Sequence, residues 1–325
     1  MNANTPVEKE ALSKERLIAK LLRQLGPAAR GSLDSEDVAE VMLNNDGTLW
    51  EDNFVHGMRK IGRMSAMDAE GLIGTVAASM GQVANYENPV VQGVLLTHSA
   101  RFQGVMPPVA DGPIFAIRKR ASRVFTLAEY VAKGIMTQAQ RERLEAAVVA
   151  GKNVVIVGGT GSGKTTLANG LLATMAELVP DTRAAIIEDT AELQCTLENK
   201  YFLTTSSYCD ADMCVFVSLR LRPDRIIVGE VRNKVAYSML KAWNTGHSGG
   251  LATVHANDAW TGIGRLVALA MEAPGVTREV AMERVAEGVN VLVSIQREGE
   301  AGGRRVREVL EVRSYENGKF DLAPY

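Results

Sequence analysis

The sequence predicts an α/β protein in which a C-terminal domain with a parallel sheet follows a smaller α+β domain and an N-terminal helix. The C-terminal half contains short apolar runs separated by helical segments, which is typical of buried parallel strands. A glycine-rich motif joins the first of these runs to a helix. The length of 325 residues exceeds that of one average domain, so two domains are expected.

Residues 1–30 are predicted to form an amphipathic helical arm. Leucine and isoleucine recur at helical spacing between Pro6 and Leu25, with basic side chains among them. Gly26-Pro27 is expected to end this helix. Such an arm can lie on a membrane surface or grip a partner, but packing on its own protein or on a sister subunit is the simpler interpretation.

Residues 31–117 are predicted to form the α+β domain. Turn signals such as Asn45-Asp46-Gly47 separate mixed helical and alternating segments, and 114–117 is one alternating run. The following segment, 118–136, is predicted to be a basic linker. Its cations are Arg118, Lys119, Arg120 and Arg123.

The C-terminal domain is predicted to span 137–325. Thr137 and Gln140 have capping-box spacing, so a helix should begin there and stop at Gly151. The expected parallel strands are 154–157, 184–187, 225–228 and 251–254. The runs 289–295, 305–315 and 319–322 are expected to be antiparallel strands appended to that core.

A phosphate-binding loop of the form GxxxxGK[ST] directly follows the first of these strands. It consists of Gly158, Gly159, Thr160, Gly161, Ser162, Gly163, Lys164 and Thr165, and Thr166 comes next. Glycines let backbone N–H groups turn around phosphates, and the N-terminus of the following helix adds partial positive charge. Lys164 would reach the β- and γ-phosphates of ATP, and the Thr165 hydroxyl would bind Mg²⁺. A chance glycine-rich turn is the alternative, but the strand–loop–helix context favours nucleotide binding.

Hydrolysis needs further polar groups, and three candidates end predicted strands. Glu230 closes 226–229 and is the preferred catalytic carboxylate, with an exposed strand-end glutamate as the alternative. Glu188 closes 184–187, although adjacent acids there can also cap a helix. Both carboxylates are candidates to hold Mg²⁺ through water. His255 ends 251–254 and is expected to sense the γ-phosphate, unless it is a satisfied core histidine.

Composition limits the partners and the compartment. The formal net charge of −2 and pI near 6.2 provide no global field for a polyanion, so no sequence-specific nucleic-acid binding is expected. The start has no leader pattern, and the longest uncharged stretch, 71–86, is too short and too polar to span a bilayer. A cytoplasmic protein is therefore expected. The three cysteines are odd in number and lack CxxC spacing, which favours neither a zinc site nor disulfides.

With these residues in place, the chain resembles the secretion NTPase superfamily of type II and type IV systems, and most closely the conjugative-transfer ATPases of the TrbB type. The motifs that carry the resemblance are Walker A at 158–165, an Asp box at 187–193, Walker B at 222–230 and a His box at 246–257. Gly229 precedes Glu230 where many other P-loop ATPases have an aspartate, and the secretion family has the same Gly-Glu pair.

This resemblance implies a RecA-like C-terminal domain and a homohexameric ring that binds nucleotide between the two domains. It implies that Arg118 reaches the nucleotide phosphates from the first domain, and it makes Arg101 a second candidate for this contact. It also implies a motor that docks on membrane-embedded type IV secretion components at the inner membrane. The alternatives are a type IV pilus motor with the same core, and a nucleotide-gated assembly scaffold whose turnover is incidental.

Overall fold

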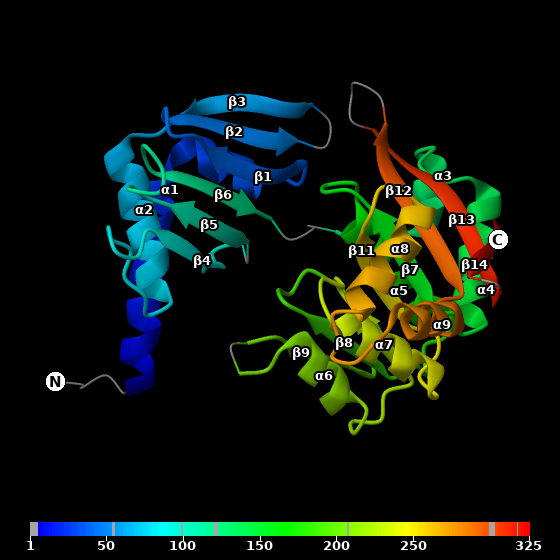
Figure 1. Cartoon of the computed structure of the whole chain (residues 1–325). Helices are drawn as coiled ribbons and strands as arrows, with labels where there is room; N and C mark the ends of the chain where they lie inside the picture. Colours follow the sequence, from blue (N-terminus) through cyan, green and yellow to red (C-terminus); the bar gives the residue numbers. More distant parts are fainter. Residues whose placement is uncertain are drawn as a thin grey trace. The chain divides into compact units, whose positions relative to one another are not determined.

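The computed structural model describes residues 6–53, 56–98, 100–119, 123–206, 208–298, 303–316 and 318–325, and only the backbone of 6–14. Arg120 of the predicted basic run therefore lies outside the described residues. The chain divides into two compact units, Met1–Ser122 and Arg123–Tyr325, which are described separately below (Figure 1). Within the described ranges, no helix combines the length and the apolar character needed to cross a membrane.

The N-terminal unit is an antiparallel sheet with helices packed on one face (Figure 1). Its elements are α1 (Pro6–Asp34), β1 (Val38–Leu43), β2 (Thr48–Asn53), β3 (Gly57–Arg63), α2 (Ala66–Ser79), β4 (Val90–Val94), β5 (Arg101–Val105) and β6 (Ile114–Arg118). The strand order is β3-β2-β1-β6-β5-β4. Along β6, Phe115 and Ile117 are buried and alternate with more exposed residues, as expected for a sheet with one covered face.

The first helix breaks at Gly26, as predicted, but a second helical segment follows directly after the break. Gly26 leaves helical geometry, with φ 69° and ψ 171°, but helix resumes at Pro27 and continues to Asp34. Proline suits a first helical turn because its fixed φ matches the helix and its missing N–H has no partner to lose there. Leu21, Leu25 and Leu33 are almost fully buried in the core of the N-terminal unit. This part of the helix therefore packs on its own protein, which was the simpler interpretation.

The C-terminal unit is a mostly parallel sheet with helices on both faces. Its elements are α3 (Leu127–Ala132), α4 (Gln138–Val149), β7 (Val154–Gly158), α5 (Lys164–Leu178), β8 (Ala184–Glu188), β9 (Lys200–Thr204), α6 (Ala211–Ser218), β10 (Arg225–Val228), α7 (Val235–Asn244), β11 (Leu251–His255), α8 (Ala259–Ala270), α9 (Arg278–Gly288), β12 (Val291–Glu298), β13 (Gly303–Glu316) and β14 (Lys319–Pro324). The strand order is β14-β13-β12-β7-β11-β10-β8-β9.

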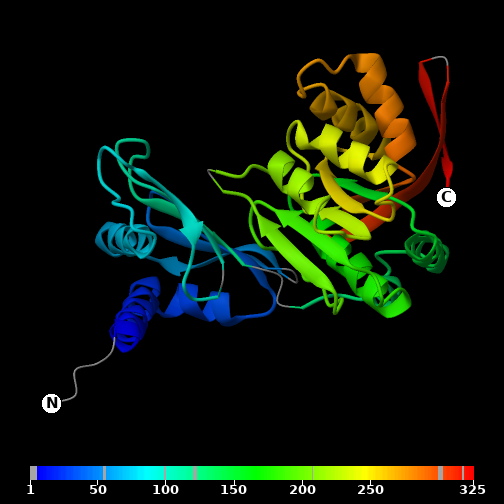
Figure 2. The ribbon, with the colours of Figure 1, turned by 90° about the horizontal axis from the view of Figure 1, so that it is seen from below.

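Two hydrophobic clusters lie on opposite faces of this sheet. One joins the strands to α6 through α9, and the other joins them to α3, α4 and α5. In Figure 2 the yellow and orange helices lie on one side of the sheet and the green helices on the other. Every residue of β7, β8 and β10 is buried, which explains why the residues between the strand ends are apolar and do not alternate with polar ones.

Several elements confirm the sequence analysis and others correct it. The capping box at Thr137 and Gln140 is present and begins α4. The predicted basic linker, however, contains α3, whose own capping box joins Thr126 and Glu129. The expectation that β12 is antiparallel to the core was wrong, because β12 pairs in parallel with β7, and only β13 and β14 are antiparallel additions. Strand β9 was not predicted.

Candidate functional site

The glycine-rich loop links β7 to α5, and its backbone requires glycine at two positions. Gly161 and Gly163 have φ of 67° and 99°, in the left-handed region that other residues rarely adopt. Gly163 is also the N-cap of α5. At Gly158, a Cβ atom would come within 2.4 Å of both the Ile295 carbonyl oxygen and Ser162 Oγ. The neighbouring atoms therefore leave no room for a side chain at Gly158.

Lys164 and Ser162 are the buried polar side chains of this loop. Lys164 is only 8% exposed, and its Nζ donates to the carbonyl oxygens of Gly158 and Gly159, at 2.8 Å each. Ser162 Oγ is buried and has no hydrogen-bond partner among the described residues, which is costly for a hydroxyl unless a ligand supplies one. A buried ammonium, an unsatisfied hydroxyl and a helix N-terminus in one loop fit a polyphosphate ligand.

Glu188 stands at the carboxyl end of β8 and is 8% exposed. Its Oε1 accepts hydrogen bonds from the backbone N–H groups of Glu192 and Leu193, at 3.0 and 2.8 Å. These N–H groups belong to a loop without helix, so the alternative role of Glu188 as a helix cap is not what the structure shows. Instead, the carboxylate fixes the loop that follows β8, whose Glu192 Oε2 accepts from Thr165 Oγ1 at 3.4 Å.

Glu230 is part of a charged cluster beside the phosphate-binding loop. Its Oε2 accepts from Arg232 Nη2 at 2.5 Å, and its Oε1 lies 3.7 Å from His255 Nε2. Arg232 also lies 3.5 Å from Asp189, and His255 Nε2 lies 3.4 Å from Lys164 Nζ. The cluster thus joins the ends of β8, β10 and β11 to the loop after β7. The His255 side chain is 45% exposed, which excludes the alternative that it is a core histidine.

The surroundings of Glu230 keep it ionised. Burial raises the pKa of this carboxyl, but the Arg232 hydrogen bond and the charges of Arg232, His255 and Lys164 outweigh burial. The net pKa therefore lies below its ordinary value. An ionised carboxylate at this position can accept a hydrogen bond from a water molecule and orient it.

The structure explains why residue 229 is a glycine. A Cβ atom there would lie 2.8 Å from Glu188 Cγ, which is closer than real Cβ contacts come. The Glu188 side chain therefore occupies the space that an aspartate at 229 would need. In this site the carboxylate beside Glu230 is therefore that of Glu188, from β8, and not that of an aspartate at position 229.

We expect Gly229→Ala to destabilise the protein by about 1–3 kcal/mol, because added atoms in packed surroundings force neighbouring side chains to move. Displacement of Glu188 should also lower nucleotide turnover. Thermal unfolding and ATPase assays would measure both effects. Gly264→Ala is the matched control, because a Cβ atom at Gly264 meets nothing within 4 Å. Equal behaviour of the two variants would contradict the proposed role of Gly229.

The two arginines expected to reach the phosphates lie in the N-terminal unit. Arg101 begins β5 and Arg118 ends β6, and the two are direct partners in the antiparallel register. On its other side Arg118 pairs in register with Glu40 of β1. Both arginines are predicted site residues, but their pairing in the sheet was not predicted. Their contact with nucleotide stays a prediction.

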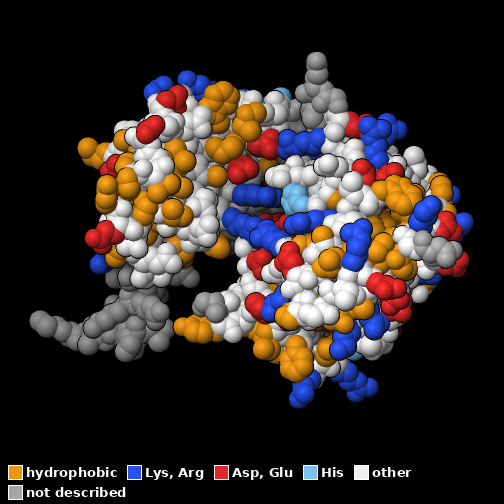
Figure 3. Space-filling view, viewed as in Figure 1, with side chains coloured by type: hydrophobic (Ala, Val, Ile, Leu, Met, Phe, Trp, Pro, Cys, Tyr) orange, Lys and Arg blue, Asp and Glu red, His pale blue; other side chains and the backbone are white. Residues whose placement is uncertain are grey.

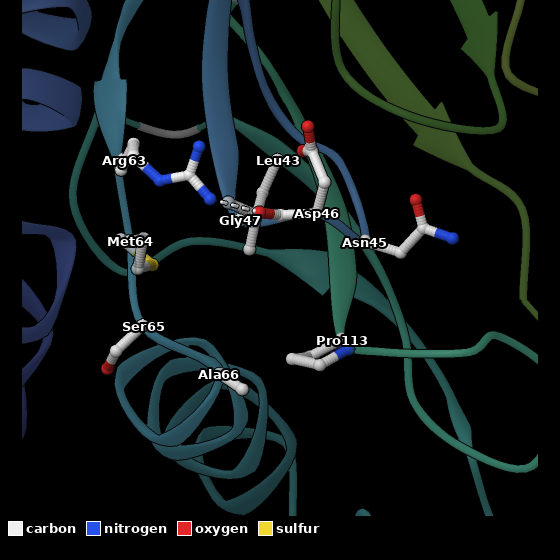
Figure 4. A pocket seen from close by; sticks show the side chains of 9 residues that line it. All are labelled: Leu43, Asn45, Asp46, Gly47, Arg63, Met64, Ser65, Ala66 and Pro113. Carbon is white, nitrogen blue, oxygen red and sulfur yellow. Dashed lines mark hydrogen bonds between the residues drawn. The ribbon is translucent and has the colours of Figure 1, made fainter.

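A separate hollow of about 400 Å³ lies in the N-terminal unit, between the turn after β1 and the start of α2 (Figure 4). Its polar groups are engaged in holding that turn: Asp46 Oδ1 accepts from Thr48, and Arg63 donates to the Asp46 carbonyl oxygen. It contains none of the predicted site residues, so we assign it no role in the chemistry. On the molecular face seen in Figure 3, acidic and basic side chains are interspersed.

Sequence reasoning missed several residues of the site. Arg232 and Glu192 lie in loops after strands, and Arg297 and Arg304 contact the phosphate-binding loop from β12 and β13. The position of Arg232, two residues after Glu230, was a usable signal, and Glu192 lies within the Asp box at 187–193. The contacts of Arg297 and Arg304 depend on tertiary structure.

Comparisons with known proteins agree with this geometry. Residues 93–297 match the family model described as "Type II/IV secretion system protein". The conjugal transfer protein TrbB of Rhizobium radiobacter is 44% identical over 313 residues, covering 96% of this chain and 95% of that protein. A probable conjugal transfer protein TrbB of Sinorhizobium fredii is 43% identical over 310 residues, covering 95% and 94%.

Solved structures share the fold. The Legionella pneumophila ATPase DotB superposes with a TM-score of 0.62 at 18% identity, covering 86% of this chain and 78% of that one. The pilus retraction motor PilT with bound ADP gives a TM-score of 0.58 at 19% identity, covering 88% and 79%. The predicted fold class, an α/β domain with a mostly parallel sheet after a smaller α+β domain, is therefore confirmed.

Proposed function

Because the chain belongs to the type II/IV secretion system protein family and has its P-loop ATPase fold, we propose that it is a motor ATPase of a conjugative type IV secretion apparatus. It would hydrolyse MgATP to energise pilus assembly or transfer of substrate. The observation that carries the proposal is the cluster of Lys164, Glu230 and His255 at one end of a phosphate-binding loop. Near-full-length similarity to two TrbB proteins supports the conjugative assignment.

In the proposed mechanism, loop N–H groups and Lys164 bind the β- and γ-phosphates. Glu230 orients a water molecule for in-line attack on the γ-phosphate, and His255, beside both Lys164 and Glu230, senses that phosphate. Thr165, with Glu188 and Glu230 through water, would hold Mg²⁺, which offsets phosphate charge when bound. Arg232 keeps Glu230 ionised and fixed in place.

We further propose that six copies form a ring and that this ring docks on membrane-embedded secretion components at the inner face of the membrane. Direct sequence-specific binding to nucleic acid is not part of this function, because the net charge is −2. Assembly is required if the site in one subunit is completed by cations from a neighbouring subunit, and a closed ring gives every copy such a neighbour.

Two measurements on the wild-type chain and one on a deletion strain test the proposal. We expect MgATP hydrolysis, a particle mass of six subunits by mass photometry, and loss of conjugative transfer when the gene is deleted. A strictly monomeric particle with full activity would overturn the ring. Pilus bundling on ATP depletion with undiminished DNA transfer would favour a pilus motor instead.

Arg118 is proposed to be the cation that the N-terminal unit supplies to the phosphates. Arg118→Ala should weaken the ATP-bound state by about 1.5–3 kcal/mol, the typical contribution of a hydrogen bond to a charged group. Lysine at this position should restore only part of the loss, because a point charge lacks the two-pronged geometry of a guanidinium. ATP affinity, turnover and a distance between spin labels on the two units would report the effect.

The exposed Lys60→Ala, on β3 of the same unit, is the matched control for charge removal. If Arg118→Ala brings the units together as fully as wild type at saturating ATP, and hydrolyses ATP at the same rate, the second cation must come from elsewhere. Arg101, its partner in the sheet, is then the next candidate.

A further inference from the structure

Two arginines from the C-terminal strands lie against the phosphate-binding loop of their own unit. Arg297, near the end of β12, donates from Nε to the Gly161 carbonyl oxygen at 3.0 Å. Arg304, near the start of β13, approaches the same oxygen through Nη2 at 3.4 Å. A Cβ atom at Gly161 would lie 2.9 Å from Arg297, and one at Gly163 would lie 2.9 Å from Arg304. Both guanidinium side chains are therefore in close contact with the loop.

The sheet order places these arginines on the opposite side of the loop from the catalytic cluster. Strand β7, which leads into the loop, has β11 as one neighbour and β12 as the other. His255 is on the β11 side, and Glu230 follows β10 one strand further away. Arg297 and Arg304 are on the β12 side. Lys164, His255 and Glu230 are the groups proposed above to meet the γ-phosphate, so the arginines lie on the side of the loop away from that phosphate.

Other arginines of β13 form ion pairs away from the phosphate-binding loop. Arg305 and Arg307 both pair with Glu298, and their side chains are 55% and 51% exposed. Successive residues of a strand point to opposite faces, so Arg304 faces the loop while Arg305 faces away. The contact with the loop is thus a property of two particular arginines and not of a general basic surface.

We propose that Arg297 and Arg304 bind the purine base of ATP, an inference that rests on the proposed ATPase function. A guanidinium is planar and stacks on aromatic rings, including nucleobases. The hydrogen bond to the Gly161 carbonyl oxygen fixes the Arg297 guanidinium beside the loop, so little side-chain entropy remains to be lost when a base stacks on it. The base is common to ATP and ADP, so both arginines contribute to nucleotide retention and not to the chemical step.

The test compares ligands with and without the base. Affinities for ATP, ADP and inorganic tripolyphosphate, each with Mg²⁺, are measured by calorimetry for wild type, Arg297→Ala and Arg304→Ala. We expect ATP and ADP to bind about 3- to 30-fold more weakly to each variant, the range for a cation on an aromatic face. Tripolyphosphate should bind as it does to wild type. Arg305→Ala is the control and should leave all three affinities unchanged.

Two results would overturn this assignment. If tripolyphosphate weakens as much as ATP, the arginines only shape the loop or pair with phosphate; if no affinity changes, they have no role in binding. Circular dichroism and thermal unfolding establish that each variant is folded, and Arg297→Gln and Arg304→Gln provide milder replacements. Failure of the wild type to bind ATP would instead contradict the proposed function itself, so the two failures are distinguishable.

Discussion

Lys164→Ala is expected to reduce ATP turnover by about 10²–10³-fold or more, as removal of one preorganised donor to a developing oxyanion does in other enzymes. The ammonium lies within the loop, 8% exposed, and its contacts with the Gly158 and Gly159 carbonyl oxygens place it where phosphate oxygens would bind. No other lysine of the described residues is bonded to this loop. Steady-state hydrolysis across a range of ATP concentrations would separate lost binding from lost chemistry.

The same change removes a donor from two loop carbonyls, so the fold must be checked independently. Circular dichroism and particle mass should match wild type, because the parallel strands and their two apolar clusters do not involve Lys164. Lys241→Ala, at an exposed position of α7, is the control for loss of a lysine charge. Wild-type turnover in Lys164→Ala would refute the assignment of the loop.

Much of the C-terminal fold was predictable because its strands are buried on both faces. The runs that became β7, β8, β10 and β11 are mostly apolar or β-branched, and each was placed within one residue of its observed bounds. The orientation of β12 was not predictable in the same way. Its first five residues are fully buried, and an apolar run does not record whether its neighbour is parallel or antiparallel.

The site residues that could be predicted are those that belong to a local sequence motif or end a predicted strand. The loop itself, and Glu188, Glu230 and His255 at strand ends, were all identified in this way, and the structure brings the last two together with Lys164. Arg297 and Arg304 lie more than a hundred positions further along the chain, in no motif. Only the pairing of β12 with β7 brings them to Gly161. Likewise, the Gly26-Pro27 signal predicted the break in the first helix but not the helical segment after it, which buries Leu33 in the core of the N-terminal unit.

Glu230→Gln is expected to keep ATP binding and assembly while reducing hydrolysis by about 10²–10⁴-fold, the usual contribution of a positioned acid or base. Glutamine preserves size but removes the charge that Arg232 and His255 face. It therefore mimics a protonated Glu230, a state that the lowered pKa of this carboxyl disfavours in the wild type. ATP affinity by calorimetry, single-turnover hydrolysis and particle mass would establish the biochemical effect.

The same variant decides between a motor and a scaffold. A motor needs repeated hydrolysis, so a donor strain carrying only Glu230→Gln should fail in conjugative transfer although the protein still binds ATP and assembles. Arg232→Gln is the companion variant: it leaves the carboxylate in place but removes its ion-pair partner, so it should retain more activity than Glu230→Gln. If Glu230→Gln binds ATP, does not hydrolyse it and still supports transfer at the wild-type frequency, then ATP binding alone orders the apparatus and the motor proposal is wrong.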